Sequence, residues 1–225
     1  MSKKSRRVAK ARRALLTLSL VLVTMVVAVG GTIAWLTDST SEITNTFTPS
    51  TIDIDLAETT GTSYKMVPGS SIEKDPEVTV VKGSEKSWVF VELVENPGIE
   101  TDTTTDPDTV TTKLFTNYLT YSIADGWTLL SESTNANVAT KVYYRVVGAD
   151  TVNDQKFDVI EGDTLTVESG LTKSNMDNLT TNPSLVVTAY AIQYDGFEPE
   201  VTEGVAEATA AQIEAAAQKA WGEIK

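Results

Sequence analysis

Alternating apolar and polar residues recur along much of this chain and predict β-strands. The clearest case is TIDIDL at 51–56, which places three aliphatic side chains on one face and two aspartates on the other, as in a half-buried strand. The run LVVTAYAIQY at 185–194 is almost wholly apolar and predicts a central strand covered on both faces. Further strands are expected at 77–81, 87–94, 118–124, 127–130, 141–147 and 164–168.

Turn signals separate these segments. Val67-Pro68-Gly69 fits a type II turn, with proline and glycine at the two central positions. Asp125-Gly126 predicts a tight hairpin. Eight or nine short strands, rich in Thr and Val, favour a mainly β fold. We expect one jelly-roll β-sandwich domain over 51–200.

Two segments depart from the strand pattern. Residues 96–113 are polar and rich in Thr, with Pro and Gly, and predict a long surface loop. Residues 201–225 are Ala-rich, and a helix is expected over 207–224, with a capping box from Thr209 to Gln212. Its apolar stripe would dock it on the sandwich, and Gly222 would end it. The stripe comprises Ile213, Ala216, Ala217, Ala220 and Trp221.

The first 34 residues have the pattern of a signal peptide. Seven basic residues and no acidic one lie within them, and an apolar segment follows at 14–29. Gly30-Gly31 would end its helix, and Thr32 and Ala34 are small residues at the −3 and −1 positions of a cleavage site before Trp35. The alternative is an uncleaved membrane anchor, because the apolar stretch is long enough to span a bilayer.

Charge and composition narrow the classes of function. The chain has 18 basic and 31 acidic residues, a net charge of −13, and the part after residue 34 keeps 11 basic and 31 acidic residues. A net charge of −20 repels nucleic acid and anionic lipid and suits a secreted protein. With no His and no Cys, the usual zinc sites, His-dependent triads and disulfides are excluded.

A specific resemblance begins at the predicted cleavage site. The motif GGTIAWLTDST at 30–40, followed by FTPSTIDIDL at 47–56, is similar to the start of TasA/camelysin-family proteins, whose signal peptide is processed by a SipW-type signal peptidase. The turn at 67–69 and the strand VTAYAIQ at 187–193 also resemble that family. The likeness is weak over 96–180.

The resemblance implies a jelly-roll protein with a few helices, secreted to the exterior or surface of a Gram-positive-type bacterium. It implies a structural role as a subunit of a biofilm fibre, built of copies of itself or of related matrix proteins. In such fibres the N-terminal segment of one subunit adds as a strand to the next. The metalloprotease label of some relatives does not carry over, because this chain has no His. We expect no enzymatic activity and no cofactor.

Residues 35–50 are the candidate donor strand. Trp35, Ile43 and Phe47 are odd-numbered and share one face of an extended segment. Strand addition to the edge of another subunit's sheet is an established mode of recognition. The alternatives are a flexible leader or the first strand of the chain's own sandwich.

Two other groups of residues could bind ligands. Asp102, Asp106 and Asp108 are weak candidates for Ca²⁺, since they lack the usual loop spacing and a Gly at the bend, and a solvated acidic loop is the simpler interpretation. Aromatic residues could line a glycan-binding face of a monomeric adhesion module, although core packing is commoner in a sandwich. These aromatic residues are Trp88, Tyr121, Trp127, Tyr143, Tyr144, Tyr190 and Tyr194.

Overall fold

The structure is a computed structural model that describes residues 51–225, apart from 62, 106–107 and 202–206. The account below concerns the unit formed by residues 49–225. The predicted signal peptide and the candidate donor strand lie outside the described residues.

The described part of the chain is mainly β, with antiparallel sheets and a C-terminal helix. The four-stranded sheet has the order β13 (Ser184–Gln193), β4 (Ser87–Asn96), β9 (Val138–Val147), β8 (Thr128–Asn135). The first three-stranded sheet has the order β1 (Ile54–Ala57), β3 (Glu77–Val80), β10 (Gln155–Asp158). The second has the order β2 (Ser71–Glu73), β11 (Thr164–Val167), β7 (Leu119–Thr120), and the third β12 (Leu179–Thr181), β5 (Gly98–Asp102), β6 (Thr109–Lys113). The helices are α2 (Lys173–Asp177) and α3 (Ala210–Ile224), with 3₁₀ turns at Phe115–Asn117 and Glu161–Asp163.

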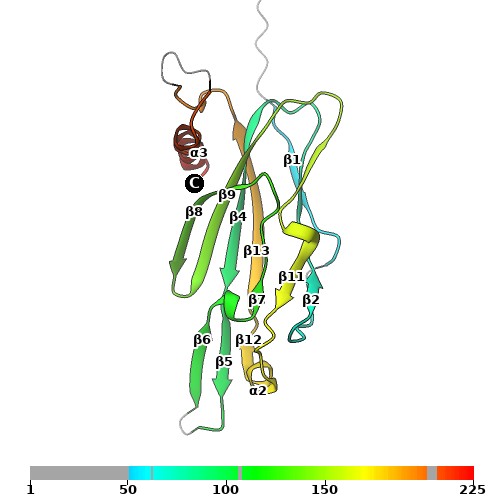
Figure 1. The fold of residues 1–225 in the computed structure, drawn as a ribbon, viewed down its shortest axis with the longest axis vertical. Helices are drawn as coiled ribbons and strands as arrows, with labels where there is room; N and C mark the ends of the chain where they lie inside the picture. Colours follow the sequence, from blue (N-terminus) through cyan, green and yellow to red (C-terminus); the bar gives the residue numbers. More distant parts are fainter. Residues whose placement is uncertain (1–50, 62, 106–107, 202–206) are drawn as a thin grey trace, which may run out of the picture. The chain divides into compact units, whose positions relative to one another are not determined.

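Prolines interrupt strands that would otherwise run on. Pro97 separates β4 from β5, and Pro183 lies between β12 and β13. The ladder of β13 with β4 is thus followed, after the break, by the ladder of β12 with β5 (Figure 1). Proline cannot donate a ladder hydrogen bond, so each pair is divided into two shorter ladders.

Strand β4 is the centre of the core because its two faces pack against different layers. Trp88 and Phe90 point toward α3, where they meet Ala217. Val89 and Val91 point the other way, into a cluster with residues of β3. All four of these β4 side chains are fully buried. Alternation along one strand therefore supplies both hydrophobic clusters.

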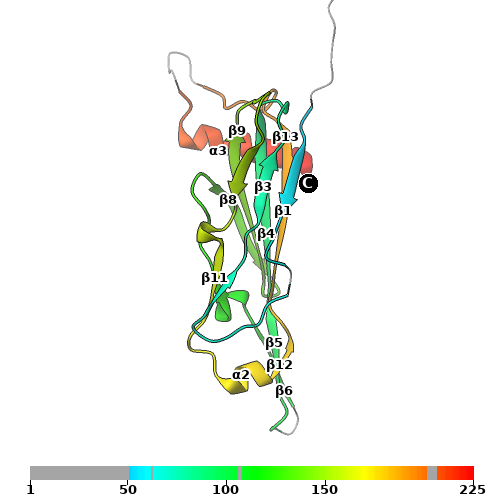
Figure 2. The same ribbon diagram turned by 90° about the vertical axis from the view of Figure 1, so that its right-hand side faces the viewer.

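Helix α3 confirms the prediction for the C-terminal segment and crosses the four-stranded sheet (Figure 2). Thr209 and Gln212 form the expected capping box. Trp221 packs its ring 5.2 Å from that of Phe90 and 5.3 Å from that of Tyr190. Gly222 does not end the helix, which continues to Ile224.

The prediction of a surface loop over 96–113 is wrong. These residues complete β4 and form the hairpin of β5 and β6, in which Gly98 pairs with Lys113. Gly98 is required there by contact rather than flexibility, since a Cβ atom would lie 2.5 Å from Cε2 of the buried Tyr118. The many Thr residues are β-branched and suit a strand, which the polar composition concealed.

The prediction that 185–194 is a central strand is also wrong. β13 pairs with β4 along one edge, and no other described strand pairs with its second edge. Its side chains are half-buried or exposed, whereas those of β4 are mostly buried.

The prediction of a hairpin at Asp125-Gly126 is wrong. A turn does occur there, but β7 before it pairs with β11, and β8 after it pairs with β9. The hairpin that joins β8 to β9 turns at Ala136 and Asn137, both with positive φ, as a type I′ turn requires.

Candidate functional site

The residues singled out for cleavage and strand donation are not among those described. Thr32, Ala34 and Trp35 of the cleavage site lie outside the described residues. So do Ile43 and Phe47 of the donor face. Their roles stay predictions, and the site must be sought in what the rest of the chain offers such a strand.

The acidic cluster is only partly described. Asp102 lies at the end of β5, where its carboxylate accepts hydrogen bonds from the amide and the hydroxyl of Thr104, which hold its pKa below the usual range. Asp108 is exposed, and Asp106 is not described. Among the described residues, no group of three or more acidic side chains is placed to hold a metal ion.

The candidate aromatic residues are divided between two clusters of the core instead of lining one surface. Trp88, Tyr144, Tyr190 and Tyr194 belong to the cluster under α3. The other three belong to the cluster on the opposite side of β4; they are Tyr121, Trp127 and Tyr143. Core packing, the simpler interpretation, is therefore confirmed.

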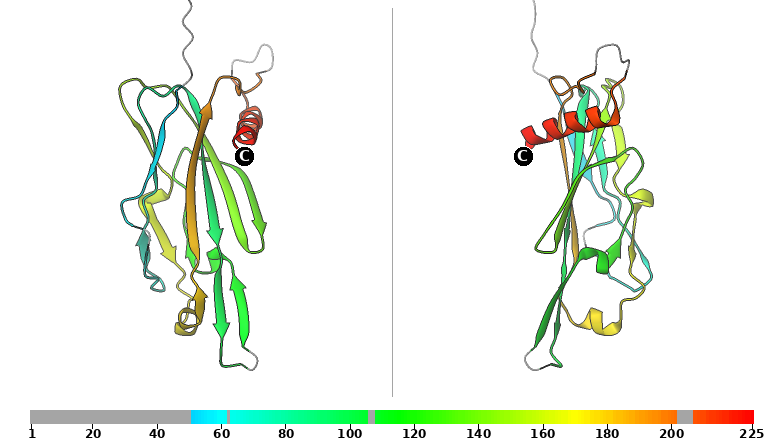
Figure 3. Two further views of the ribbon diagram at one scale, coloured as in Figure 1. Left: turned by 180° about the vertical axis from the view of Figure 1, so that it is seen from behind. Right: turned by 60° about the vertical axis from the view of Figure 1, so that its left-hand side comes forward.

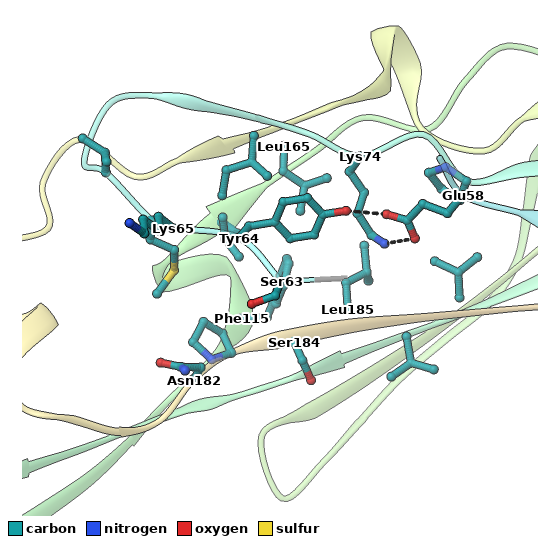
Figure 4. A pocket seen from close by; sticks show the side chains of 18 of the residues that line it. Glu58, Ser63, Tyr64, Lys65, Lys74, Phe115, Leu165, Asn182, Ser184 and Leu185 are labelled. Atoms are coloured by element: carbon teal, nitrogen blue, oxygen red, sulfur yellow. Dashed lines mark hydrogen bonds and ion pairs between the residues drawn. The ribbon is translucent and has the colours of Figure 1, made fainter. Parts of the chain in front are cut away.

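A cavity of about 900 Å³ opens beside the first half of β13 (Figure 4). One wall is the start of β13, from Ser184 to Val187, and the other is the end of β1 with the connection 63–67 toward β2. Its floor is apolar and includes Phe115 and Leu165. We call this feature the seam, meaning the cavity together with the facing strands β1 and β13.

The seam lies where two edge strands run close together. β1 is the edge of its three-stranded sheet, and β13 is the edge of the four-stranded sheet. The two run alongside each other (Figures 1 and 3), yet among the described residues each is hydrogen-bonded as a strand only on its other side. Apolar side chains along both stay half-buried, as Ile54, Leu56 and Val187 show. The core is therefore incompletely covered along this line.

A polar network at the cavity holds the connection between β1 and β2 in place. Tyr64 donates a hydrogen bond to Oε1 of Glu58 at 2.6 Å, and Glu58 forms an ion pair with Lys74 (Figure 4). Burial and the neighbouring carboxylate of Glu58 raise the pKa of Tyr64. Lys74 is 8% exposed, so its ammonium group depends on this partner. We call the described residues 58–61 and 63–67 the strap.

A second anchor fixes the start of the strap. Asp75 accepts hydrogen bonds from the backbone amides of Thr59 and Thr60, each at 3.0 Å, and from both hydroxyls. The side-chain hydrogen bond from Thr59 is the main cause that lowers the pKa of Asp75, and those from Thr60 add to it. The strap is thus held by hydrogen bonds and one ion pair, not by strand pairing.

Sequence reasoning missed the seam for a physical reason. The apolar run of β13 indicated burial, and nothing local distinguishes an edge strand from a central one when both are apolar. The one available signal was Asn182-Pro183 directly before the strand, since proline is confined to edges and strand starts.

Comparisons with family models, curated proteins and solved structures find no match to this chain. In the described portion, no helix has the length and apolar character needed to cross a membrane. The geometry of the seam is therefore the main guide to function.

Proposed function

We propose that this chain is a secreted structural protein, a subunit of an extracellular fibre or biofilm matrix. After a SipW-type signal peptidase cuts behind Ala34, residues 35–50 of one copy add as a strand along the seam of the next. The observation that carries the proposal is the seam itself, an open sheet edge beside an apolar cavity. An edge strand with free backbone groups is a template for pairing with another chain.

The donor segment suits the seam in length and character. It has 16 residues, more than the 10 of β13. Main-chain hydrogen bonds to β13 would supply affinity, and the cavity would receive aromatic side chains such as Phe47. Val186 of β13 and Val67 of the strap present 48% and 57% of their surface to solvent, and a donor strand beside β13 would cover part of this surface.

Such a contact produces filaments because it joins two different surfaces. The donor of one copy engages the acceptor of the next, so the interface is heterologous and need not close into a ring. The proposal also includes a jelly-roll topology and a helical signal peptide, in keeping with the resemblance to TasA/camelysin proteins.

Before cleavage, the apolar part of residues 1–34 would hold the chain at the membrane and keep residues 35–50 from reaching another subunit. Cleavage would therefore also permit assembly.

The test is to examine the protein that begins at Trp35 by electron microscopy and light scattering. We expect filaments from this protein and none from Phe47→Asp. The matched control is Thr48→Asp, which adds the same charge on the opposite face of the strand and should still polymerise. Normal filaments from Phe47→Asp would refute donation through this face.

Mixing two variants tests which edge accepts the donor. Leu185→Asp places a charge on the wall of the cavity and should block acceptance while leaving donation intact. Phe47→Asp should do the reverse. Mixed together, they should form a two-subunit complex that does not grow. Filaments from Leu185→Asp alone would exclude the cavity side of β13 as the acceptor.

Processing and charge add two checks. In the full chain, Ala34→Arg should block both cleavage and assembly, and soluble fibres from it would contradict the coupling. Subunits with a net charge of −20 repel one another, so added salt should promote polymerisation by screening. A steady loss of fibres with salt would contradict main-chain pairing as the driving contact.

The cavity also favours a second candidate, a monomeric surface adhesion or glycan-binding module. Its volume of about 900 Å³ lies in the range of small-molecule sites, and Tyr64 and Lys74 supply polar groups at its wall. A persistent monomer that binds polysaccharide, and loses binding in Tyr64→Ala, would favour this function over fibre formation.

A further inference from the structure

A second polar cluster surrounds a buried carboxylate at the end of the molecule formed by β5, β6 and α2 (Figure 1). Its centre is Glu100 of β5, which is 8% exposed. Oε2 of Glu100 accepts a hydrogen bond from Nζ of Lys113 at 2.8 Å and another from Nδ2 of Asn175 at 3.2 Å. Oε1 accepts one from the hydroxyl of the fully buried Tyr118 at 2.8 Å.

This arrangement differs from two other ion pairs in which the described residues have a largely buried glutamate. Lys141 with Glu95, and Lys74 with Glu58, are lysine–carboxylate pairs in which no side-chain amide takes part. At Glu100, one carboxylate oxygen binds a lysine nitrogen and an asparagine amide together. The two nitrogen atoms therefore lie at most about 6 Å apart.

The side-chain carbonyl of Asn175 is fixed by the capping box that begins α2. Oδ1 accepts hydrogen bonds from the backbone amide of Thr172 at 3.0 Å and from its hydroxyl at 2.7 Å. Two donors aimed at a carbonyl oxygen stabilise the negative charge that develops there when a nucleophile adds to the carbon.

We propose that Lys113 and Asn175 become joined by an intramolecular amide bond, with Glu100 as the proton relay. The ammonium group of Lys113 passes a proton to the Glu100 carboxylate and becomes a neutral amine. Nζ then forms a bond to Cγ of Asn175, and the bond from Cγ to Nδ2 breaks. Glu100 returns its proton to the departing Nδ2, which leaves as ammonia. The attacking nitrogen Nζ then loses one of its two remaining protons to this ammonia, which becomes ammonium.

The reaction balances without any other reactant. A lysine ammonium and a primary amide enter, and a secondary amide and an ammonium ion leave, with no change of oxidation state. Glu100 ends as the carboxylate it was at the start. Tyr118 holds the carboxylate in place through its hydrogen bond to Oε1.

The amide bond would stabilise the fold of a chain that cannot form disulfides. With no Cys, no disulfide can form. The β5–β6 hairpin and α2 lie beyond the proline breaks at 97 and 183, where the long ladder is interrupted. A link from β6 to α2 closes a long loop of chain and thereby restricts the unfolded state. This proposal does not depend on fibre formation or on strand donation.

The test is mass spectrometry of the full chain after unfolding. We expect a mass lower by one ammonia than the sequence requires. Trypsin should fail to cut after Lys113, and peptide 87–141 should remain attached to peptide 174–219. Loss of ammonia with normal cleavage after Lys113 would indicate a cyclised side chain instead and would overturn the proposal, as would an unchanged mass.

Variants assign the roles. Lys113→Arg keeps the charge and the donor to Glu100 but lacks a nucleophilic amine, so the ammonia loss and the linked peptides should disappear. Glu100→Gln removes the relay and should do the same. The matched control is Lys173→Arg, on the exposed surface of α2, which should keep the link. A link that persists in Glu100→Gln would exclude Glu100 as the relay.

Discussion

Strands β4 and β13 are neighbours of 10 residues each, paired along their full length, and both are apolar in sequence. Their environments nevertheless differ. β4 has a strand on either side and a covered layer on each face, and its first five residues are all buried. β13 has one described strand partner, and the cavity lies beside its first residues. Burial in this protein thus follows from how many sides of a strand are occupied, not from how apolar the strand is.

The largest difference should appear when matched leucines are shortened. Leu93 of β4 is fully buried, whereas Leu185 of β13 is half-buried at the cavity wall. Leu93→Ala should lower the free energy of unfolding by about 2–5 kcal/mol, because it leaves a void in a packed core. Leu185→Ala should cost clearly less, because the space beside it is already open.

Denaturant unfolding of both variants measures this difference. Equal losses for the two leucines would show that the seam is as tightly packed as the centre of β4, and the contrast between the two strands would fail. The two variants should have the same m-value, the slope of unfolding free energy against denaturant concentration. The comparison then reflects stability alone.

A smaller difference should separate two tyrosine–glutamate hydrogen bonds. Tyr121 donates to Glu95 at 2.7 Å on the buried side of β4, and Tyr64 donates to Glu58 at 2.6 Å in the strap. The side chain of Glu95 is 2% exposed and that of Glu58 is 19% exposed. Tyr121→Phe should therefore cost about 1–3 kcal/mol and Tyr64→Phe less, since water can replace a lost donor only where it has access.

Thermal or denaturant unfolding of the two variants checks this prediction. Tyr143→Phe is the control, because burial and nearby charges, and no hydrogen bond, account for the raised pKa of its hydroxyl, and it should leave stability nearly unchanged. A greater loss from Tyr64→Phe than from Tyr121→Phe would mean that the strap contributes more to stability than the centre of the sheet.

The smallest effect should be local and depend on pH. Hydrogen bonds from the strap, above all that from the Thr59 hydroxyl, hold the pKa of Asp75 below its usual range. A group with a lowered pKa in the folded state stabilises that state above its unfolded pKa. This contribution is lost as pH falls through the folded pKa. The strap should therefore loosen in strong acid, before β4 does.

Hydrogen exchange of the Thr59 and Thr60 amides, compared with that of β4 amides such as Phe90, provides the measurement. Exchange corrected for the intrinsic effect of pH should rise in the strap as acid is added. Asp75→Asn should weaken protection of the strap at neutral pH and remove its dependence on acid. Protection of the strap that does not change with acid would mean that Asp75 is not its anchor.

Local patterns were sufficient where each residue's environment depended on near neighbours in the chain. The alternation over 51–56, the type II turn at 67–70 and the capped helix from Thr209 all appear as predicted. The hairpin over 98–113 was missed because its buried members are few and polar. Glu100 is hydrogen-bonded to Lys113 of β6, to Tyr118 just after the 3₁₀ turn, and to Asn175 of α2, which are far apart in the sequence or in different elements.

The amino-acid sequence by itself determined that the chain is mainly β, that a capped helix follows the strands, and that His- and Cys-dependent chemistry is excluded. These properties depend on composition and on short-range periodicity. Only the tertiary structure decided that β4 is central and β13 is an edge, that a cavity lies between β13 and the strap, and that Glu100 joins a lysine to an asparagine. Strand order and the meeting of distant side chains arise from contacts across the chain, which no local pattern of apolar and polar residues encodes.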